Sequence, residues 1–274
     1  MIQQDLDQVE FIIFDTETTG LEPESGDRIV EIAAIKFKGE KEIATFQSLI
    51  NPHRPITQAA FQVNKITPQM LQDAPAIDKV LPQFLGFIQN SCVCSYNATF
   101  DLEFLHNESR LLGKEIPKDI VVVDILKMAK RLLPNLERYA LWYVADRLGI
   151  STQQSHRALS DVKLTLEVFN KLKVIFNTKG IFDFTNFLSL FGLNSHFLDN
   201  INNQKLAKIQ EAIDLGVKLK IKYLSSSNAQ VSQRDVIPKE IKQEKNRSYL
   251  IGHCFLRNEK RTFNIDGILH LEII

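Results

Sequence analysis

The sequence has little cysteine, no excess of charge of either sign and no long apolar run. Its three cysteines, in 274 residues, argue against a disulfide scaffold and indicate a reducing compartment. Cys92 and Cys94 have no second cluster to complete a zinc site, so we interpret them as core thiols on a strand. The polar N-terminal residues do not resemble a signal peptide, and no apolar run approaches the roughly 18 residues of a membrane span. These absences predict a soluble, cytoplasmic protein with no membrane partner.

Because positive and negative residues are balanced, the net charge does not predict a binding partner. Lys+Arg and Asp+Glu both total 33, so binding to nucleic acid would require a local positive face or bound cations. A hydrophobic content of 44% and a charged content of 24% are typical of globular proteins. The length allows one large or two modest domains.

Hydrophobic patterns in residues 1–176 predict an α/β fold, with a layered sheet flanked by helices. Short connections favour an antiparallel meander of the first three strands, and residues 55–70 are predicted to be irregular until Thr67-Pro68 starts a helical turn. The predicted strands are 9–15, 28–37, 43–50, 91–95 and 120–123. The predicted helices are 78–89, 100–112, 125–133, 138–148 and 159–176.

The remaining residues predict a connector and a second, smaller domain. Residues 177–203 are rich in phenylalanine, which indicates a packed connector because flexible linkers lack aromatic residues. A short helix at 206–215 precedes five predicted strands, which favour a small β-barrel. Those strands are 219–223, 231–237, 249–256, 261–266 and 268–273. We therefore expect domains at 1–176 and 204–274.

Two carboxylates two residues apart close the first predicted strand. On an extended backbone Asp15 and Glu17 point to one face, and such a pair is disfavoured without a positive partner. Two interpretations are open: solvated acids at a strand end, or half of a metal site at the lip of a buried sheet.

Three further residues lie at junctions that could share a cleft with this pair. Asp101 lies where a strand passes into a helix, and His156 and Asp161 lie where a loop enters the last helix of the first domain. In layered α/β folds these junctions gather at one edge of the sheet. Four carboxylates there would require cations such as Mg²⁺ or Mn²⁺, and two such ions support in-line displacement at phosphorus. His156 is the candidate general base.

The ordered motifs resemble those of the DEDDh family of 3′-to-5′ exonucleases. Phe14-Asp15-Thr16-Glu17-Thr18-Thr19-Gly20 resembles the first motif, Asn97-x-x-Phe100-Asp101 the second, and His156-Arg157-Ala158-x-x-Asp161 the third. Residues 60–67 resemble the substrate-side loop of the family. Within the family, the chain is most similar to exonucleases of the type found as the proofreading (epsilon) subunit of bacterial DNA polymerase III.

This resemblance implies a ribonuclease H-like mixed sheet and hydrolysis of phosphodiester bonds from a 3′ end, with release of nucleoside monophosphates. It implies that Asp15, Glu17, Asp101 and Asp161 hold two Mg²⁺ or Mn²⁺ ions and that His156 is the base. The substrate-binding residues that it implies are Thr18, Thr19, Asn64, Asn97 and Phe100. The chain departs from the family pattern at Tyr96 and Asn64, where some members have histidine, and this leaves the substrate preference open.

The second domain resembles a WYL domain, an SH3-like barrel of bacterial regulators of nucleic-acid metabolism. The resemblance rests on Ile221-Lys222-Tyr223, Arg247-Ser248-Tyr249-Leu250 and Arg261-Thr262-Phe263, with Ser248 in place of the name-giving tryptophan. Arg234, Arg257 and Arg261 could line a pocket for a nucleotide or a nucleic-acid strand. Alternatively, they are solvated or paired with nearby carboxylates.

Three functions follow from these patterns. The first is a metal-dependent exonuclease acting on a 3′ end of single-stranded DNA, with a DNA polymerase or repair protein as a potential partner. The second is the same chemistry on RNA or short oligonucleotides, and the third is a non-catalytic nucleic-acid-binding regulator.

Overall fold

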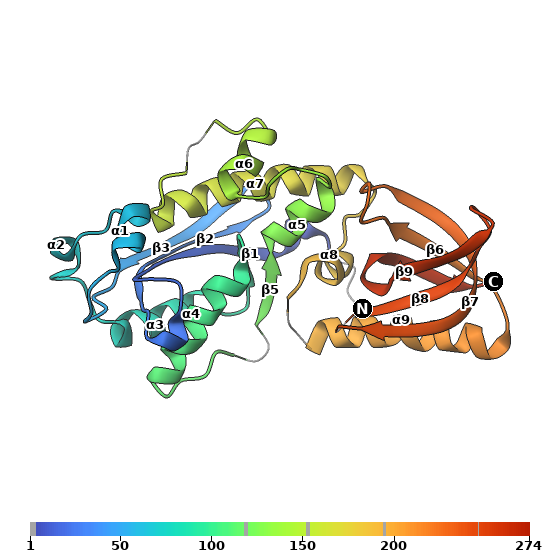
Figure 1. Ribbon diagram of the computed structural model, residues 1–274, viewed down its shortest axis with the longest axis horizontal. Coiled ribbons are helices and arrows are strands. Elements are labelled where there is room, and N and C mark those ends of the chain that lie inside the picture. The colour runs from blue at the N-terminus through green and yellow to red at the C-terminus, as the bar shows by residue number, and fades with distance from the viewer. Residues whose placement is uncertain (1–3, 118–119, 152–153, 194–195, 246) are drawn as a thin grey trace.

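The computed structural model describes residues 4–117, 120–151, 154–193, 196–245 and 247–274. Two sheets lie toward opposite ends of an elongated molecule, with helix α8 between them (Figure 1). The first sheet is built from the N-terminal strands and the second from the C-terminal strands.

The first sheet is mixed and five-stranded, in the order β3-β2-β1-β4-β5. β1 pairs antiparallel with β2 and parallel with β4, and β2 pairs antiparallel with β3, which confirms the predicted meander. β1 occupies the middle because its apolar run is buried on both faces. The bounds are β1 (Glu10–Thr18), β2 (Ile29–Lys38), β3 (Lys41–Leu49), β4 (Cys92–Ser95) and β5 (Val121–Asp124).

Helices cover both faces of this sheet (Figure 1). Phe11 and Ile13 of β1 belong to the core beneath α5, α6 and α7, whereas Ile12 and Phe14 belong to the core beneath α3 and α4. This alternation is the period of two expected for a strand buried on both sides. The bounds are α3 (Ile77–Phe87), α4 (Ala98–Leu111), α5 (Ile125–Leu132), α6 (Leu141–Arg147) and α7 (Ala158–Thr178).

The segment predicted to be irregular contains a helix. α1 (Gln58–Asn64) is capped by Thr57, whose hydroxyl accepts a hydrogen bond from the amide of Ala60. The prediction of an irregular segment was therefore wrong in this part, because the Thr57 cap was overlooked. The predicted start at Thr67-Pro68 is confirmed by α2 (Pro68–Leu71), where Thr67 accepts from the amide of Met70. Single 3-10 turns occur at Leu6–Gln8, Pro23–Ser25 and Ile265–Gly267.

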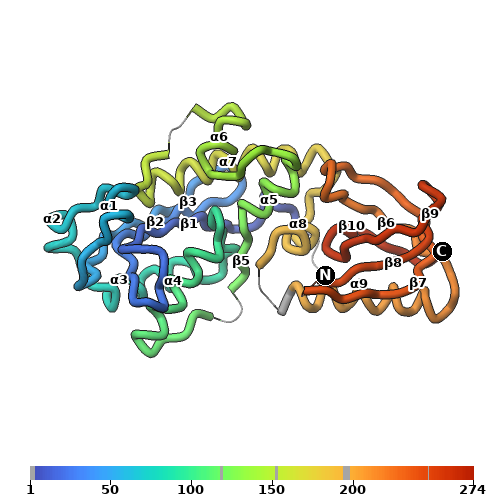
Figure 2. The backbone as a smooth tube through the Cα atoms, in the orientation of Figure 1, coloured from blue at the N-terminus to red at the C-terminus, as the bar shows by residue number. Residues whose placement is uncertain are grey.

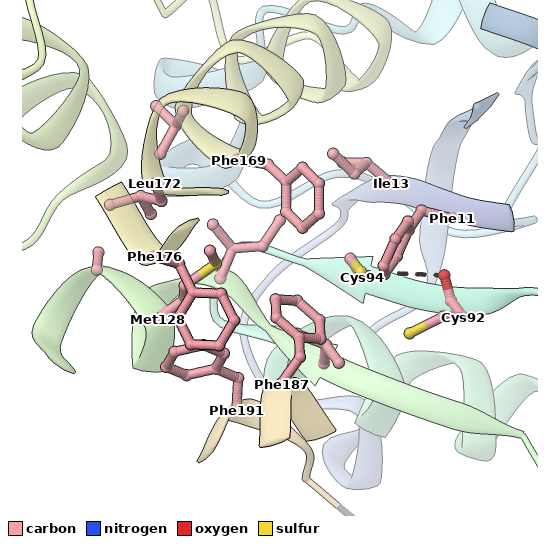
Figure 3. Packing of buried hydrophobic residues seen from close by; sticks show 14 of the residues in the cluster. Phe11, Ile13, Cys92, Cys94, Met128, Phe169, Leu172, Phe176, Phe187 and Phe191 are labelled. Atoms are coloured by element: carbon pink, nitrogen blue, oxygen red, sulfur yellow. Dashed lines mark hydrogen bonds between the residues drawn. The ribbon is translucent and has the colours of Figure 1, made fainter. Parts of the chain in front are cut away.

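The phenylalanine-rich stretch forms a helix that packs into the first core. α8 (Phe184–Phe191) places Phe187 and Phe191 against Phe176 of α7, with ring centroids 5.9 Å and 5.5 Å from that ring (Figure 3). Phe187 also lies 5.7 Å from Phe11 of β1, centroid to centroid. The sequence did not predict α8, and it predicted only the second half of α9 (His196–Leu215). The asparagines and glycines of this stretch obscured the helical period.

The second sheet is antiparallel and five-stranded, in the order β10-β6-β7-β8-β9. α9 packs on one face, with Ile209 and Ala212 in the same core as Leu219 and Leu250 of the sheet. Figure 2 shows β10 and β6 side by side at one end of this order. The bounds are β6 (Leu219–Leu224), β7 (Val231–Glu244), β8 (Arg247–Cys254), β9 (Glu259–Asn264) and β10 (Ile268–Ile273).

This sheet is open, so the expected closed SH3-like barrel is not what the strand pairing forms. Among the described residues, no ladder joins β9 to β10, which are the outer strands of the sheet. The five strands themselves were predicted, but closure depends on the edge strands meeting, which the pattern of apolar residues does not encode.

The cysteines are free and buried, which confirms the prediction of core thiols. Cys92 and Cys94 lie on β4, where the Cys94 thiol contacts the carbonyl of Cys92 at 3.9 Å (Figure 3). Within the part of the chain described here, no helix combines the length and apolar character needed to cross a bilayer.

Candidate active site

Asp15 and Glu17 lie within β1, not beyond its end. The predicted strand stopped at residue 15, whereas β1 continues to Thr18. Both residues share the face of Phe11 and Ile13, which is the face that α7 covers. The strand therefore aims the two carboxylates toward the first turn of α7.

Asp161 completes a group of three carboxylates on this face. One carboxylate oxygen from each of Asp15, Glu17 and Asp161 lies within 4.8 Å of the others. Asp161 is in the first turn of α7 and is 3% exposed. Its Oδ2 accepts a hydrogen bond of 2.9 Å from Gln154 Nε2, and its Oδ1 accepts one of 3.3 Å from the amide of Ser155.

Burial and mutual repulsion disfavour the charged forms in this cluster. Burial raises the pKa of Asp15 well above its usual value, and the charges of Asp101 and Glu17 raise it further. The pKa of Glu17 is raised to about 8, first by burial and then by the charges of Asp161 and Glu31, while Arg157 lowers it. The negative charge of these carboxylates must therefore be compensated by bound protons or by a cation.

The donor set fits a hard divalent cation. All three groups offer carboxylate oxygens, the ligands that Mg²⁺ and Mn²⁺ prefer. The raised pKa of Glu17 is what an acidic site shows without a cation, since a bound cation favours the ionised form. Asp15, Glu17 and Asp161 are the residues that would hold such an ion.

Asp101 reaches the site from the opposite face of the sheet. It lies in the first turn of α4, and its Oδ1 accepts hydrogen bonds from the amide of Thr16 at 3.0 Å and the hydroxyl of Thr16 at 2.7 Å. Its Oδ2 accepts a bond of 2.5 Å from the hydroxyl of Ser95. Burial raises its pKa to about 6, and these hydrogen bonds oppose the rise. The charge of Asp101 therefore acts on Asp15, although Asp101 is not a member of the group of three carboxylates.

His156 lies at the open side of the cluster. Its Nδ1 is 3.9 Å from Oδ2 of Asp161, and its side chain is 45% exposed. Its backbone adopts a left-handed conformation with φ of 53° in the loop before α7. A partly exposed imidazole beside buried carboxylates can exchange a proton with solvent at the rim of the site.

An ion pair between a buried glutamate and a partly exposed arginine positions this loop, and the sequence interpretation missed it. Glu31 of β2 is directly opposite Glu17 in the ladder and is fully buried. Both its carboxylate oxygens accept hydrogen bonds of 3.0 Å from the Arg157 guanidinium, and Oε2 accepts one of 3.2 Å from the amide of Ala158. The available signal was a glutamate on an otherwise apolar strand, combined with the arginine beside His156.

A second pair of this kind anchors the start of β2. Glu108 of α4 is fully buried and accepts hydrogen bonds of 2.8 Å and 2.6 Å from the Arg28 guanidinium, and one of 3.2 Å from the amide of Ile29. This pair was also missed, because Glu108 gave no signal other than its position on a helix. It links α4, which carries Asp101, to the central strands.

A cavity of about 550 Å³ adjoins the acidic cluster at Glu17. Of the predicted substrate-binding residues, Thr18, Asn64 and Phe100 line it. Asn64 is buried and donates a hydrogen bond of 3.3 Å to the carbonyl of Thr18, which fixes α1 against the end of β1. These three residues are thus brought together beside the acidic cluster.

The other two predicted substrate-binding residues lie outside this cavity's lining. Thr19 is fully buried, and its hydroxyl donates to Asp27 Oδ1 at 2.8 Å. Asn97 is exposed at the start of α4 and has a left-handed backbone conformation. Its backbone N–H donates a hydrogen bond of 3.1 Å to Asp124 Oδ1. Their visible role is to shape the turns that follow β1 and β4.

The three arginines predicted for a second-domain pocket are spread over two strands and a turn. Arg261 on β9 pairs with Glu259 at 2.8 Å. Arg234 on β7 contacts the hydroxyl of Ser232 at 3.1 Å and the thiol of Cys254 at 3.8 Å. Arg257 is exposed in the turn between β8 and β9.

Comparison with known proteins places relatives on both parts of the chain. The family model described as Exonuclease matches residues 12–169, and the WYL domain model matches residues 204–273. The chain is 38% identical over 168 residues to a DNA polymerase III subunit epsilon of Treponema pallidum (strain Nichols), covering 61% of this chain and 77% of that protein.

The chain is also similar to longer proteins. It is 32% identical over 248 residues to a DNA polymerase III PolC-type of Clostridium perfringens (strain 13 / Type A), covering 89% of this chain and 17% of that protein. Across three longer relatives the chain spans 11% to 26% of their length.

A solved structure shares the fold. The zinc-bound form of the E. coli ExoI–ssDNA complex matches with a TM-score of 0.59 at 18% identity, over 89% of this chain and 54% of that chain. Since the exonuclease model spans more than half of the sequence, the chain belongs to the DEDDh-type exonuclease family and carries a C-terminal WYL domain.

Proposed function

We propose that this chain is a metal-dependent 3′-to-5′ exonuclease that hydrolyses DNA from its 3′ end and releases nucleoside monophosphates. The observation that carries the proposal is the group of Asp15, Glu17 and Asp161, in which one carboxylate oxygen of each lies within 4.8 Å of the others, beside His156. The relatives named DNA polymerase III subunit epsilon and PolC-type support DNA as the substrate.

Two Mg²⁺ or Mn²⁺ ions are the proposed cofactors. When bound, they supply Lewis-acid stabilisation for in-line displacement at phosphorus. Asp15, Glu17 and Asp161 would hold them, with Asp101 as the fourth proposed ligand. Thr16 and Ser95 orient the Asp101 carboxylate by donating hydrogen bonds to it.

His156 is the proposed general base. Its distance of 3.9 Å from Asp161 and its 45% exposure allow it to take a proton from a water molecule at the cluster and pass that proton to solvent. The Glu31–Arg157 pair supports this role, because it fixes the residue that follows His156.

The cavity beside Glu17 is the proposed position of the terminal nucleotide. Thr18 and Asn64 contribute polar groups, and Phe100 contributes an aromatic surface on which a base can stack. Thr19 and Asn97 are proposed to act through the turns that they shape.

For the second part of the chain we propose a nucleotide- or nucleic-acid-sensing role. Arg234, Arg257 and Arg261 are the proposed contacts, although Arg261 would have to exchange its pairing with Glu259 for a phosphate. We propose domain bounds of 1–176 and 204–274 around the connector 177–203. A polymerase or repair protein is the proposed partner.

The test is a side-by-side digestion of single-stranded DNA, duplex DNA and RNA, each labelled at its 5′ end, with Mg²⁺ present. We expect progressive shortening of single-stranded DNA from the 3′ end. Preferential digestion of RNA would assign the alternative exoribonuclease function. Binding without digestion of any of the three would indicate a non-catalytic regulator and overturn the proposal.

A further inference from the structure

A cavity of about 360 Å³ lies between α8, α9 and the β6–β10 edge of the second sheet. We call it the junction pocket, because α8 packs into the core of the first sheet while β6 and β10 belong to the second. It is remote in the fold from the acidic cluster, which lies at the other end of α7 from α8 (Figure 1). None of the proposed catalytic or ligand residues lines it.

The walls of the junction pocket carry several basic groups. Lys205 and Lys208 come from α9, Lys222 from β6 and His270 from β10. Asp183 is the acidic residue of the lining, and both its carboxylate oxygens accept hydrogen bonds from Asn186, at 2.8 Å and 2.9 Å. The lining therefore has an excess of positive charge in a protein whose net charge is zero.

Lys205 is the most informative of these residues. Its Nζ donates to the hydroxyl of Ser189 at 2.8 Å and approaches the carbonyl of Ile265 at 3.5 Å. No carboxylate of the described residues lies within ion-pair distance of this ammonium. Burial lowers its pKa to about 8, and the more distant charges of Asp266 and Asp183 oppose this shift. Because Lys205 is partly buried and its hydrogen-bond partners are neutral groups, an anion in the pocket would stabilise its charge.

The rest of the lining is mixed, with an apolar part beside the polar residues Thr185, Asn186 and Gln204. Ile181, Ile201 and Leu269 are each less than one tenth exposed and contribute to the walls. A volume of this size is at the lower end of the range for small-molecule sites, which are mostly apolar with a few placed polar groups. An anionic ligand with an apolar part could contact both the basic and the apolar side chains of the lining.

We propose that the junction pocket binds a small organic phosphomonoester of the nucleoside monophosphate class. The phosphate would contact Lys205, with Lys208 and Lys222 as further cations, because ammonium groups bind phosphate as point charges. The base and sugar would lie against the apolar walls. The ligand would touch α8 and the second sheet together, and so join the two parts of the chain.

The test is isothermal titration calorimetry on the full chain, with a chelator present to exclude metal-dependent binding at the acidic cluster. The probes are dAMP, adenosine and inorganic phosphate. We expect dAMP to bind more tightly than either fragment, because it alone contacts both the basic and the apolar side chains of the lining.

Three variants locate the binding. Lys205→Met should weaken dAMP binding about tenfold or more, the effect of losing one charge-assisted hydrogen bond. Lys208→Ala changes an exposed residue on the same helix and should also weaken it, which keeps the test decisive if Lys205→Met folds poorly. Lys220→Ala, on β6 but outside the lining, is the matched control and should leave binding unchanged.

The inference is overturned if dAMP does not bind, or binds equally to wild type, Lys205→Met and Lys208→Ala. Phosphate or adenosine binding as tightly as dAMP would also overturn the proposed ligand class. Because no hydrolysis is measured and no metal is present, a failure here is separate from a failure of the proposed exonuclease function.

Discussion

Raising the pH should destabilise the metal-free protein through Glu17. The folded-state pKa of this carboxyl is about 8, against an ordinary value of 4.5. Between these values the folded protein holds a proton that the unfolded chain releases. The contribution of Glu17 to stability is therefore fully present below about pH 4.5 and is lost as the pH rises through about 8.

The size of the effect follows from the two pKa values. At about 1.4 kcal/mol per pKa unit, Glu17 alone should lower the free energy of unfolding by roughly 3 to 4 kcal/mol between about pH 5 and pH 8. Asp15, whose pKa is also raised, adds to the same trend. Saturating Mg²⁺ should remove most of it, since a cation that binds only the folded state stabilises that state.

The assay is urea denaturation in a chelator at several pH values, followed by the fluorescence of Trp142. This residue is the single tryptophan of the chain and lies on α6, in the layer that covers the first sheet. Glu17→Gln should reduce the pH dependence, whereas Glu40→Gln, in the exposed turn between β2 and β3, should leave it unchanged. Equal pH dependence in wild type and Glu17→Gln would refute the electrostatic reasoning.

Further substitutions have distinct expected outcomes. His156→Ala should lower the rate of hydrolysis by about 10² to 10⁴-fold but retain metal binding, measured by calorimetry. Asp15→Ala should lose both hydrolysis and metal binding. Retained metal affinity in the Asp15 variant would contradict its assignment as a ligand. Arg157→Ala removes the bidentate partner of the buried Glu31, so it should lower the free energy of unfolding by roughly 1 to 3 kcal/mol. Adding Glu31→Gln should restore part of that loss, and no recovery in the double variant would contradict the ion-pair account. Phe187→Ala should cost about 3 to 5 kcal/mol in urea denaturation, because this ring is fully buried between α7 and β1, and a loss below about 1 kcal/mol would contradict its place in the core.

Much of the first domain could be predicted because its signals are local. A run of apolar residues ending in Asp15 and Glu17 predicts a central strand that presents two carboxylates on one face, and the period of two holds in the structure. The position of Asp161 at a helix entry likewise follows from the sequence around it. These features require no knowledge of which face each helix covers.

The features that escaped prediction depend on contacts between distant residues. Asp101 approaches β1 from α4, on the face opposite to α7, and a helix pattern does not state which face it will cover. Glu31 finds Arg157 across 126 positions of sequence. The open edges of the second sheet and the junction pocket also arise only when separate elements meet.

The most direct test of the central claim is the digestion of 5′-labelled single-stranded DNA with Mg²⁺ by wild type and two matched variants. The acidic cluster at the end of β1 predicts a ladder that shortens from the 3′ end with release of mononucleotides. That activity should be lost in Asp15→Asn and unchanged in Asp73→Asn, which alters an exposed aspartate outside the cluster. Intact DNA with the wild-type protein, or undiminished digestion by Asp15→Asn, would contradict the claim.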